Sequence, residues 1–367
     1  MAKICKDILF DNKRMSGFKV GTLRKYIFLD FSNGEEIPLS LERDMEKGES
    51  NRYRNESNYY YDTWSDGLSL EFNIVKNPEL YHTQFEMEFS KNEIREITSW
   101  LSSPHLPQWL EIENYKEDEN DAVRYKGWFN NIENWVVAGR VYGLKLYFKC
   151  TTPFAYTKDI INKSTVSSYK NVLIKNDSDE KKSYCYPTIH IEPKSNGYIY
   201  ICNLSDCKIL KNGILGGSPG TYFDNLTSTV ESYAREHGCK LDYAAPVGTV
   251  LNIIPICDNT AVQFYLTDIY GVSKKCTAFF LPDTKEYRII EGGFMYMKVY
   301  TSLNVDIDCQ KLIITDGTGR MVTYDKLGIN DVDMMYWFRL INGNNTILLY
   351  GNANFKITHI ESRKVGE

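Results

Sequence analysis

The side chains that most often carry out catalysis are sparse in this sequence, and none of them is placed as a recognisable pair. Five histidines stand at positions 82, 105, 190, 237 and 359, with no Gly-x-Ser-x-Gly or His-Glu-x-x-His motif beside any of them. His190 lies in an alternating segment, 188–192, where a histidine with its hydrogen bonds satisfied inside a sheet is the better interpretation. We therefore predict that the chain is not an enzyme and that it uses no cofactor.

Metal-binding and phosphate-binding patterns are also poorly represented. The nine cysteines are odd in number and form no Cys-x-x-Cys motif. Cys202 and Cys207 lack the two further ligands that a zinc site would need, so free thiols in a reducing cytoplasm are the preferred interpretation. The acidic cluster at 117–121 could bind calcium, but a solvated loop is favoured. The glycine-rich run 216–220 lacks the Gly-Lys-Ser/Thr ending of a phosphate loop. No metal site is predicted.

Aromatic side chains offer another kind of chemistry, because their large amphipathic rings favour strands and protein interfaces. They make up 14% of the chain, with 27 tyrosines and 17 phenylalanines. Residues 44–67 form a polar excursion that carries several of these rings. The contact candidates that we single out in this excursion are Arg52, Tyr59, Tyr60, Tyr61 and Trp64. The alternative for this segment is a plain solvated loop.

The elements that must position these residues are mostly strands. One helix is predicted to begin at Ser90, where Glu93 completes a capping box, and to carry an apolar stripe along one face. A helix this short cannot bury its stripe alone, so it must pack on a sheet. The expected strands around it are 68–75, 84–89, 108–112, 123–129, 132–137 and 144–150. Residues 1–157 are thus expected to form an N-terminal domain, followed by a linker or long loop at 158–183.

A second all-β pattern follows, and it is interrupted by a segment of different residue composition. The pattern starts near residue 186 and resumes after 304, with strands expected at 305–309, 312–315, 336–340, 346–350 and 354–360. Residues 206–303 between them begin with a Gly/Pro-rich stretch and a predicted helix at 224–237. Strands are then expected at 249–254, 261–267, 276–281, 287–290 and 294–301. We interpret 206–303 as a β-rich module inserted into a C-terminal domain made of 158–205 and 304–367.

The inserted module is the candidate for glycan binding. Asp268, Tyr270 and Tyr296 could supply hydrogen bonds and a stacking surface to a sugar. The alternative is that tyrosines at strand spacing are structural.

Length and charge limit the function further. A chain of 367 residues suggests two or three domains. Its 43 basic and 48 acidic residues leave a net charge of −5, which argues against a dedicated nucleic-acid-binding protein. The N-terminus has no apolar segment of a secretory signal, and no apolar run approaches the roughly 20 residues that cross a bilayer. We expect a soluble protein that is made in the cytoplasm and does not enter a membrane.

A resemblance to a known family rests on short segments in a fixed order. The N-terminal segments are Arg43-Asp44 with Gly48, Leu70-Glu71-Phe72, Trp100-Leu101, Trp109-Leu110, Tyr125-Lys126-Gly127 and the run Cys-Thr-Thr-Pro-Phe-Ala-Tyr at 150–156. The C-terminal segments are Ile307-Asp308-Cys309, Thr318-Gly319-Arg320, the run Trp-Phe-Arg-Leu-Ile-Asn-Gly-Asn-Asn at 337–345 and the run at 361–366. Over about residues 20–205 and 304–367, the chain resembles the distal tail proteins of long-tailed bacteriophages that infect Gram-positive bacteria.

This resemblance implies an all-β protein that forms a ring, usually a homohexamer. The N-terminal β-sandwich domains would form the ring, and galectin-like C-terminal β-sandwiches would project from it. Such rings join the tail tube protein to the tail-associated hub protein, next to the tape measure protein, and they scaffold receptor-binding proteins. The contact candidates at 52–64 would then touch the ring or the tube. The protein would end in the virion tail after assembly in the cytoplasm of the host bacterium.

DNA would only pass through the lumen of such a ring. Six copies at −5 each would carry a charge of about −30, and acidic walls would let DNA slide without sticking. The Trp-Gly-x-Glu segment with which galectins stack a sugar is absent, so sugar binding is not expected of the galectin-like fold itself.

Two other classes of function stay open at this stage. The first is a carbohydrate-binding adhesin that contacts host cell-wall polysaccharide through the inserted module. The second is a wall-degrading enzyme with a carboxylate pair in that module.

Overall fold

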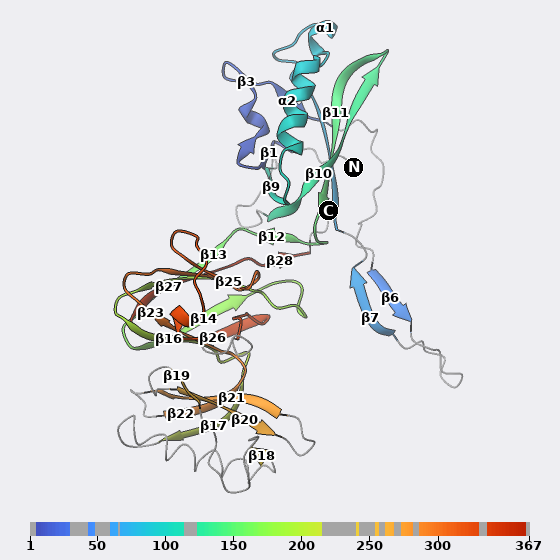
Figure 1. Ribbon diagram of the computed structural model, residues 1–367. Helices are drawn as coiled ribbons and strands as arrows, with labels where there is room; N and C mark the ends of the chain where they lie inside the picture. Colours follow the sequence, from blue (N-terminus) through green and yellow to red (C-terminus); the bar gives the residue numbers. More distant parts are fainter. Residues whose placement is uncertain are drawn as a thin grey trace, which may run out of the picture. The chain divides into compact units, whose positions relative to one another are not determined.

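Figure 1 shows the computed structural model of the chain, which forms two compact units. Unit 1 contains residues 1–158 and 362–367, and unit 2 contains residues 159–361. The structure describes residues 5–29, 43–47, 59–64, 67–113, 123–214, 240–241, 254–256, 261–267, 273–281, 286–329 and 336–364. Apart from two short α-helices and 3₁₀ turns, the regular elements in this part of the chain are strands, so the prediction of an all-β protein is confirmed.

Unit 1 is built on one antiparallel sheet of nine strands. Its order is β2-β1-β9-β10-β11-β8-β5, and β12 pairs with both β10 and β28. The bounds are β1 Asp7–Phe10, β2 Lys13–Arg14, β5 Tyr26–Phe28, β8 Ser69–Lys76, β9 Gln108–Glu113, β10 Val123–Val137, β11 Arg140–Cys150, β12 Ala155–Thr157 and β28 Ser362–Arg363. Two hairpins complete the unit: β3 Lys19–Val20 with β4 Leu23–Arg24, and β6 Arg43–Lys47 with β7 Tyr59–Trp64.

The sheet of unit 1 curls so that its two halves face one core. Phe10 on β1 makes edge-to-face contacts with Phe129 on β10 at 5.0 Å and with Phe148 on β11 at 5.9 Å. Because β9 and β10 separate β1 from β11 in the strand order, a flat sheet would hold these rings well apart. Gly127 allows the bend, since a Cβ at this position would lie 2.1 Å from the carbonyl oxygen of Lys149.

Helix α2, Lys91–Ser102, packs into this curled sheet as the sequence predicts. Ser90 and Glu93 form the expected capping box, and the buried stripe contains Ile97, Trp100 and Leu101. The indole Nε1 of Trp100 donates a hydrogen bond of 3.2 Å to the carbonyl oxygen of Phe10. The helix therefore contacts the sheet through both apolar packing and a buried polar bond.

The first turn of α2 is also held by charge. The Glu93 carboxylate lies 3.0 Å from the Lys25 ammonium and 2.9 Å from the Lys76 ammonium, and it accepts a 2.8 Å hydrogen bond from the Ser90 amide. Burial alone raises the pKa of Glu93, but the hydrogen bonds from Ser90 and both lysines outweigh burial and lower the pKa to about 2.

The strand predicted at 84–89 is wrong. Residues Gln84–Met87 form helix α1, because Thr83 and Glu86 complete a second capping box. Phe85 is 71% exposed and Phe89 is buried, although the alternation of the sequence places both on one face of a strand. The capping box therefore favoured a helix at Gln84–Met87, although the apolar residues of this segment alternate as in a strand.

Unit 2 contains a β-sandwich of two antiparallel sheets. The first sheet has the order β13-β27-β15-β24-β25, and the second has the order β14-β26-β16-β23. Their bounds are β13 Ile160–Val166, β14 Tyr169–Asn176, β15 Thr188–Pro193, β16 Gly197–Asn203, β23 Phe294–Val299, β24 Val305–Asp308, β25 Ile313–Asp316, β26 Gly343–Tyr350 and β27 Ala353–His359. The core between the sheets includes Ile189 and Phe355 from the first and Ile201 and Leu349 from the second.

A third sheet covers the other face of the four-stranded sheet. Its order is β17-β22-β21-β20-β18, with β19 paired to β20. The bounds are β17 Lys208–Ile214, β18 Lys240–Leu241, β19 Ile254–Ile256, β20 Ala261–Thr267, β21 Ser273–Leu281 and β22 Glu286–Glu291. Phe279 and Ile290 of this sheet share a core with Tyr200, Phe294 and Leu348 of the sandwich. The segment that we interpret as an insertion therefore packs on the sandwich through this third sheet, whereas β23, which we predicted as its last strand, belongs to the sandwich itself.

Two further expectations for unit 2 are corrected, and a third lies outside the described residues. The stretch 158–183 is not a loop, because β13 and β14 lie within it and pair with β27 and β26. Residues 336–340 are extended, but only Leu340 makes a ladder contact, an isolated bridge to Cys185. The predicted helix at 224–237 falls outside the described residues.

The end of β27 buries a titratable pair. The His359 side chain is fully buried, and its Nε2 atom lies 3.8 Å from Oε1 of Glu361. Burial lowers the pKa of His359 although the neighbouring carboxylate raises it.

We predict that Glu93→Gln lowers the free energy of unfolding by about 2 kcal/mol at pH 7, because a buried partner of two lysines is lost. The folded-state pKa of Glu93 is depressed, so its contribution is complete above its ordinary value of 4.5 and is lost as the pH falls toward 2. Urea unfolding at pH 7 and pH 2.5 should show the two proteins converging at the lower pH. Glu96→Gln, an exposed carboxylate on the same helix, is the control and should change little.

A second prediction concerns mild acid. Because the pKa of His359 is lowered in the folded state, the unfolded chain binds the proton first, and stability should fall as the pH drops below 6.5. Protonation of this one group can lower the free energy of unfolding by up to about 1.4 kcal/mol per pH unit. His359→Leu should flatten the profile of unfolding free energy between pH 7.5 and 5.5, whereas the exposed His82→Gln should not. An unchanged slope in His359→Leu would contradict the assignment.

Candidate functional site

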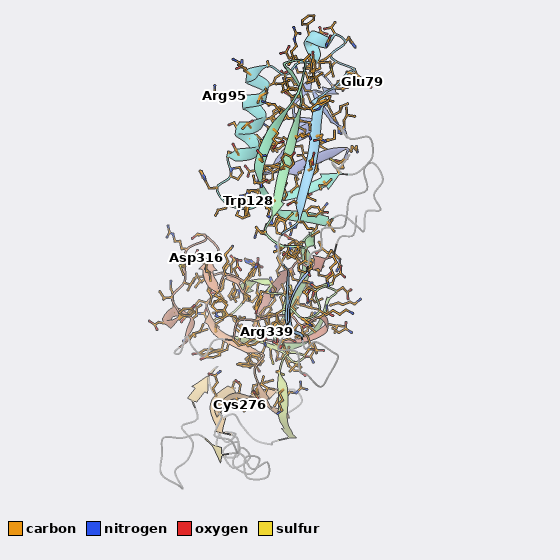
Figure 2. The ribbon with its side chains drawn as sticks, turned by 90° about the vertical axis from the view of Figure 1, so that its right-hand side faces the viewer. Glu79, Arg95, Trp128, Cys276, Asp316 and Arg339 are labelled. Carbon is orange, nitrogen blue, oxygen red and sulfur yellow. The ribbon has the colours of Figure 1, made fainter. Side chains whose placement is uncertain are left out.

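Unit 1 leaves large apolar side chains exposed at the end of helix α2. Leu106 is 72% exposed and Trp128, which projects from β10, is 41% exposed (Figure 2). Together with Pro104 and Pro107 they line a groove with a volume of about 520 Å³. Isolated apolar side chains are ordinary on a protein surface, but adjoining ones around a groove mark a contact surface.

Strand β10 has ladders to strands on both of its sides over only part of its length. Residues Arg124–Gly127 pair with β9, but from Trp128 to Val137 the described ladders of β10 involve β11 alone. Val136 and Val137 near the hairpin tip are 53% and 43% exposed. Exposed apolar side chains at the end of a hairpin are a surface that another chain can cover.

The contact candidates of the polar excursion are placed only in part. Tyr59–Trp64 forms β7, which pairs with β6 in the register Arg43↔Trp64 to Lys47↔Tyr59. Tyr60 and Tyr61 lie within this strand, whereas Arg52 and the side chains of the strand are outside what the structure describes. Their role in contact therefore stays a prediction.

The three glycan candidates are not brought together in the described part of the chain. Asp268 and Tyr270 lie outside the described residues. Tyr296 is only 8% exposed and packs against Phe294 in the core under the third sheet, with ring centroids 6.3 Å apart. A ring buried in this way has no open face on which a sugar could stack.

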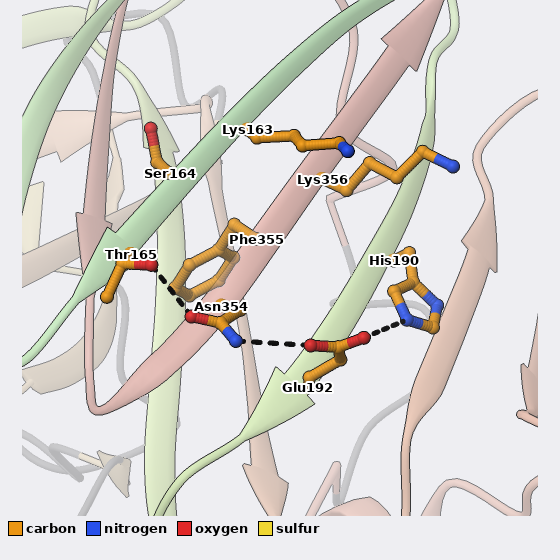
Figure 3. Close-up of a pocket in the computed structure, with 8 residues that line it drawn as sticks. All are labelled: Lys163, Ser164, Thr165, His190, Glu192, Asn354, Phe355 and Lys356. Atoms are coloured by element: carbon orange, nitrogen blue, oxygen red, sulfur yellow. Dashed lines mark hydrogen bonds and ion pairs between the residues drawn. The ribbon is translucent and has the colours of Figure 1, made fainter.

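A polar pocket lies instead on the outer face of the five-stranded sheet, with a volume of about 370 Å³. A chain of hydrogen bonds crosses it (Figure 3): Thr165 to Asn354 at 2.8 Å, Asn354 to Glu192 at 3.1 Å, and Glu192 to the His190 Nε2 atom at 3.3 Å. The other ring nitrogen of His190 lies 2.6 Å from Asp306. His190 is thus held by its sheet neighbours, as we expected, but the sequence did not show that it belongs to a pocket.

A second polar cluster fixes the chain where β16 leads into the third sheet. Asp206 accepts hydrogen bonds from the Tyr336 hydroxyl and from Arg339 Nε, the latter at 2.6 Å. The guanidinium of Arg339, labelled in Figure 2, lies 3.7 Å from the ring centroid of Tyr184. Burial, followed by the bond to Asp206, raises the pKa of Tyr336. The neutral Tyr336 hydroxyl is hydrogen-bonded to an Asp206 carboxylate that is itself paired with Arg339. This arrangement stabilises the fold and does not suit a general base.

Burial makes two of the described thiols poorly suited to nucleophilic chemistry, whereas the hydrogen bond with Cys202 lowers the pKa of Cys207. Burial raises the pKa of Cys185 to about 11 and that of Cys309 to about 12. Within the same part of the chain, no three His, Cys, Asp or Glu side chains are grouped so as to hold a metal ion. None of the helices described there is long and apolar enough to cross a bilayer.

Comparison with known proteins matches both parts of the chain to phage tail families. Residues 3–152 match the family described as phage tail protein N-terminal domain, and residues 154–237 match the phage tail C-terminal domain. The second match runs past residue 206, where we place the start of the insertion, and that boundary stays a prediction. No curated protein matches the chain significantly.

Solved structures with a similar course of the chain come from phage tails, at low identity. The Dit (gp 19.1) protein of phage SPP1, described as a paradigm of hub adsorption apparatus in phages infecting Gram-positive bacteria, is 11% identical. The alignment covers 96% of this chain and 98% of that one, with a TM-score of 0.48. A chain of the phage P2 baseplate in its activated conformation with Ca is 10% identical over 98% and 99% of the two chains, with a TM-score of 0.40.

The family assignment therefore rests on the two sequence matches, which follow one another along the chain and meet at residues 152–154, close to the division between the two units. The N-terminal match spans nearly all of the described part of unit 1, including the curled sheet and helix α2. The chain belongs to the phage tail proteins and is a component of the virion.

Proposed function

We propose that this protein is a structural component of the distal tail, where six copies close into a ring. The ring would join the tail tube protein to the tail-associated hub protein, beside the tape measure protein, and would scaffold the receptor-binding proteins. DNA would pass through its lumen. In this proposal the protein performs no catalysis.

The observation that carries the proposal is the exposed apolar surface of unit 1. Leu106 and Trp128, together with Val136 and Val137 near the tip of the β10–β11 hairpin, are costly features on an isolated domain, because they expose apolar area to water. A second copy that covers this surface would remove the cost. Closed rings arise when such a contact repeats with rotation between unlike surfaces of each copy.

The β6–β7 hairpin suits a second contact. Both strands lie outside the nine-stranded sheet and pair only with each other among the described ladders. An isolated two-stranded hairpin is marginally stable in water, so a partner surface is expected to support it. The tube or the neighbouring copy is the partner that we propose for Arg52, Tyr59, Tyr60, Tyr61 and Trp64.

The second candidate function is adhesion to host cell-wall polysaccharide. With Tyr296 buried, an adhesin acting through the insertion would have to use Asp268, Tyr270 and other residues outside the described part. A glycan-binding monomer would also leave the apolar surface of unit 1 unexplained, so the ring is the better-supported function.

Mass photometry and negative-stain microscopy of the purified chain test the ring directly. We expect sixfold rings in the unmodified protein. The double variant Leu106→Glu/Trp128→Glu should weaken self-association roughly tenfold or more, because buried aromatic anchors dominate interface energetics. Leu173→Glu is the matched control, since Leu173 is 63% exposed on β14 of unit 2. A chain that stays monomeric at high concentration, or a double variant that forms rings as the parent does, would exclude this role for the surface.

A further inference from the structure

The outer face of the five-stranded sheet places like charges next to each other. In the register of β13 and β27, Lys163 stands directly opposite Lys356, and Lys356 in turn stands opposite His190 on β15. Like charges directly opposite one another destabilise an antiparallel pair. Neither lysine forms an ion pair with a carboxylate in the described part of the chain. The sheet thus carries two exposed lysines at directly opposed positions, with the Glu192 carboxylate near enough to interact with Lys163.

A row of hydrogen-bonding groups lies two residues further along the same strands. Thr165 is opposite Asn354, and Asn354 is opposite Glu192, so the two rows share one face of the sheet. The Glu192 carboxylate is fixed between the Asn354 amide and the His190 ring. Fixed carboxylate, amide and hydroxyl groups are suited to bind the hydroxyls of a sugar or polyol.

Residues of these two rows line the pocket of about 370 Å³, and Figure 3 shows both lysine side chains extending in the same direction. The pocket has no aromatic stacking surface, because the ring of Phe355 is only 2% exposed and belongs to the core of the sandwich. A neutral sugar recognised by stacking is therefore a poor fit.

We propose that this pocket binds a sugar or polyol that carries an anionic group, either a phosphate or a carboxylate. The ammonium groups of Lys163 and Lys356 donate hydrogen bonds to the anionic oxygens, which also relieves the repulsion between them. Glu192, Asn354 and Thr165 bind the adjacent hydroxyl groups. The site lies on unit 2, is formed by other residues than the buried Tyr296, and does not depend on ring formation.

Isothermal titration of the full chain with four probes tests the proposal. The probes are glycerol 3-phosphate, glucuronate, glucose and inorganic phosphate, and the first two distinguish a phosphate from a carboxylate source. We expect saturable binding of at least one of these two anionic polyols. Glucose and inorganic phosphate should each bind at least fivefold more weakly than that probe, since each offers only half of the recognised chemistry.

Variants separate the two rows of the pocket. Lys163→Gln/Lys356→Gln should weaken binding of the anionic polyol at least fivefold and reduce its salt dependence. Glu192→Gln should weaken binding of the anionic polyol but not binding of inorganic phosphate. The substitution removes an acceptor for the hydroxyl groups of the polyol and, at the same time, a negative charge that repels phosphate. Lys170→Gln, which removes an exposed lysine from β14, is the control and should bind as the parent does.

Thermal unfolding guards against a folding artefact. The unliganded double lysine variant should melt at the same temperature as the parent or higher, because the opposed charges are gone. Equal binding of glucose would overturn the anionic part of the proposal, and equal binding of inorganic phosphate would overturn the polyol part. Parental affinity in the double lysine variant, or no binding of either anionic polyol, would overturn the site. These outcomes can be read in the ring-weakened Leu106→Glu/Trp128→Glu protein as well, so a failure here is separate from a failure of the ring.

Discussion

The attachment of helix α2 to the curled sheet is the constraint on which unit 1 depends. A helix of 12 residues is marginal in water, so Ile97, Trp100 and Leu101 must be buried by something other than the helix itself. The sheet buries them by curling, which also brings Phe10 against Phe129 and Phe148. Glu93 then ties the first turn of the helix to Lys25 and Lys76. Hydrophobic packing fixes how deeply the helix sits, and the buried charges fix its register, because an unpaired buried carboxylate would be costly.

In unit 2, the four-stranded sheet lies between two other sheets, so it must be apolar on both faces. Along β16, consecutive residues from Ile199 to Asn203 are buried, with Ile199 and Ile201 facing one core and Tyr200 and Cys202 facing the other. A strand between two layers cannot show the alternation of a half-solvated strand. The third sheet is therefore part of one three-layered body, and the surface left for ligands on the sandwich is the outer face of the five-stranded sheet.

The polar groups inside unit 2 differ in their pairing from those on the outer face of the five-stranded sheet. Inside unit 2, Asn203 is paired with Asn345 at 3.0 Å and Asp206 with Arg339 at 2.6 Å, since an unpaired buried group costs more than the bond returns, whereas both ring nitrogens of His359 lack a hydrogen-bond partner among the described residues. On the outer face, Lys163 and Lys356 stand opposite each other, and neither forms an ion pair with a carboxylate among the described residues, although Lys163 contributes to lowering the pKa of Glu192. A tail protein has to hold its shape within an assembly and present surfaces to other molecules. The paired interior groups serve the first requirement, and the exposed groups of the outer face are the places where partners and ligands are expected.

The sequence by itself determined the features that depend on neighbours along the chain. The capping box at Ser90, the apolar stripe of α2 and the strand 261–267 were predictable because their signals lie within a few residues. The sequence led to a wrong prediction of a strand at 84–89, where a capping box competed with strand-like alternation. It also led to a wrong prediction of a loop at 158–183, where β13 and β14 are polar because one face of each strand is solvated. Only the tertiary structure decided that Tyr296 is buried under a third sheet and that Lys163, Lys356 and His190 stand in one row. Cross-strand register joins residues more than 150 positions apart, and no local pattern encodes which of them become neighbours.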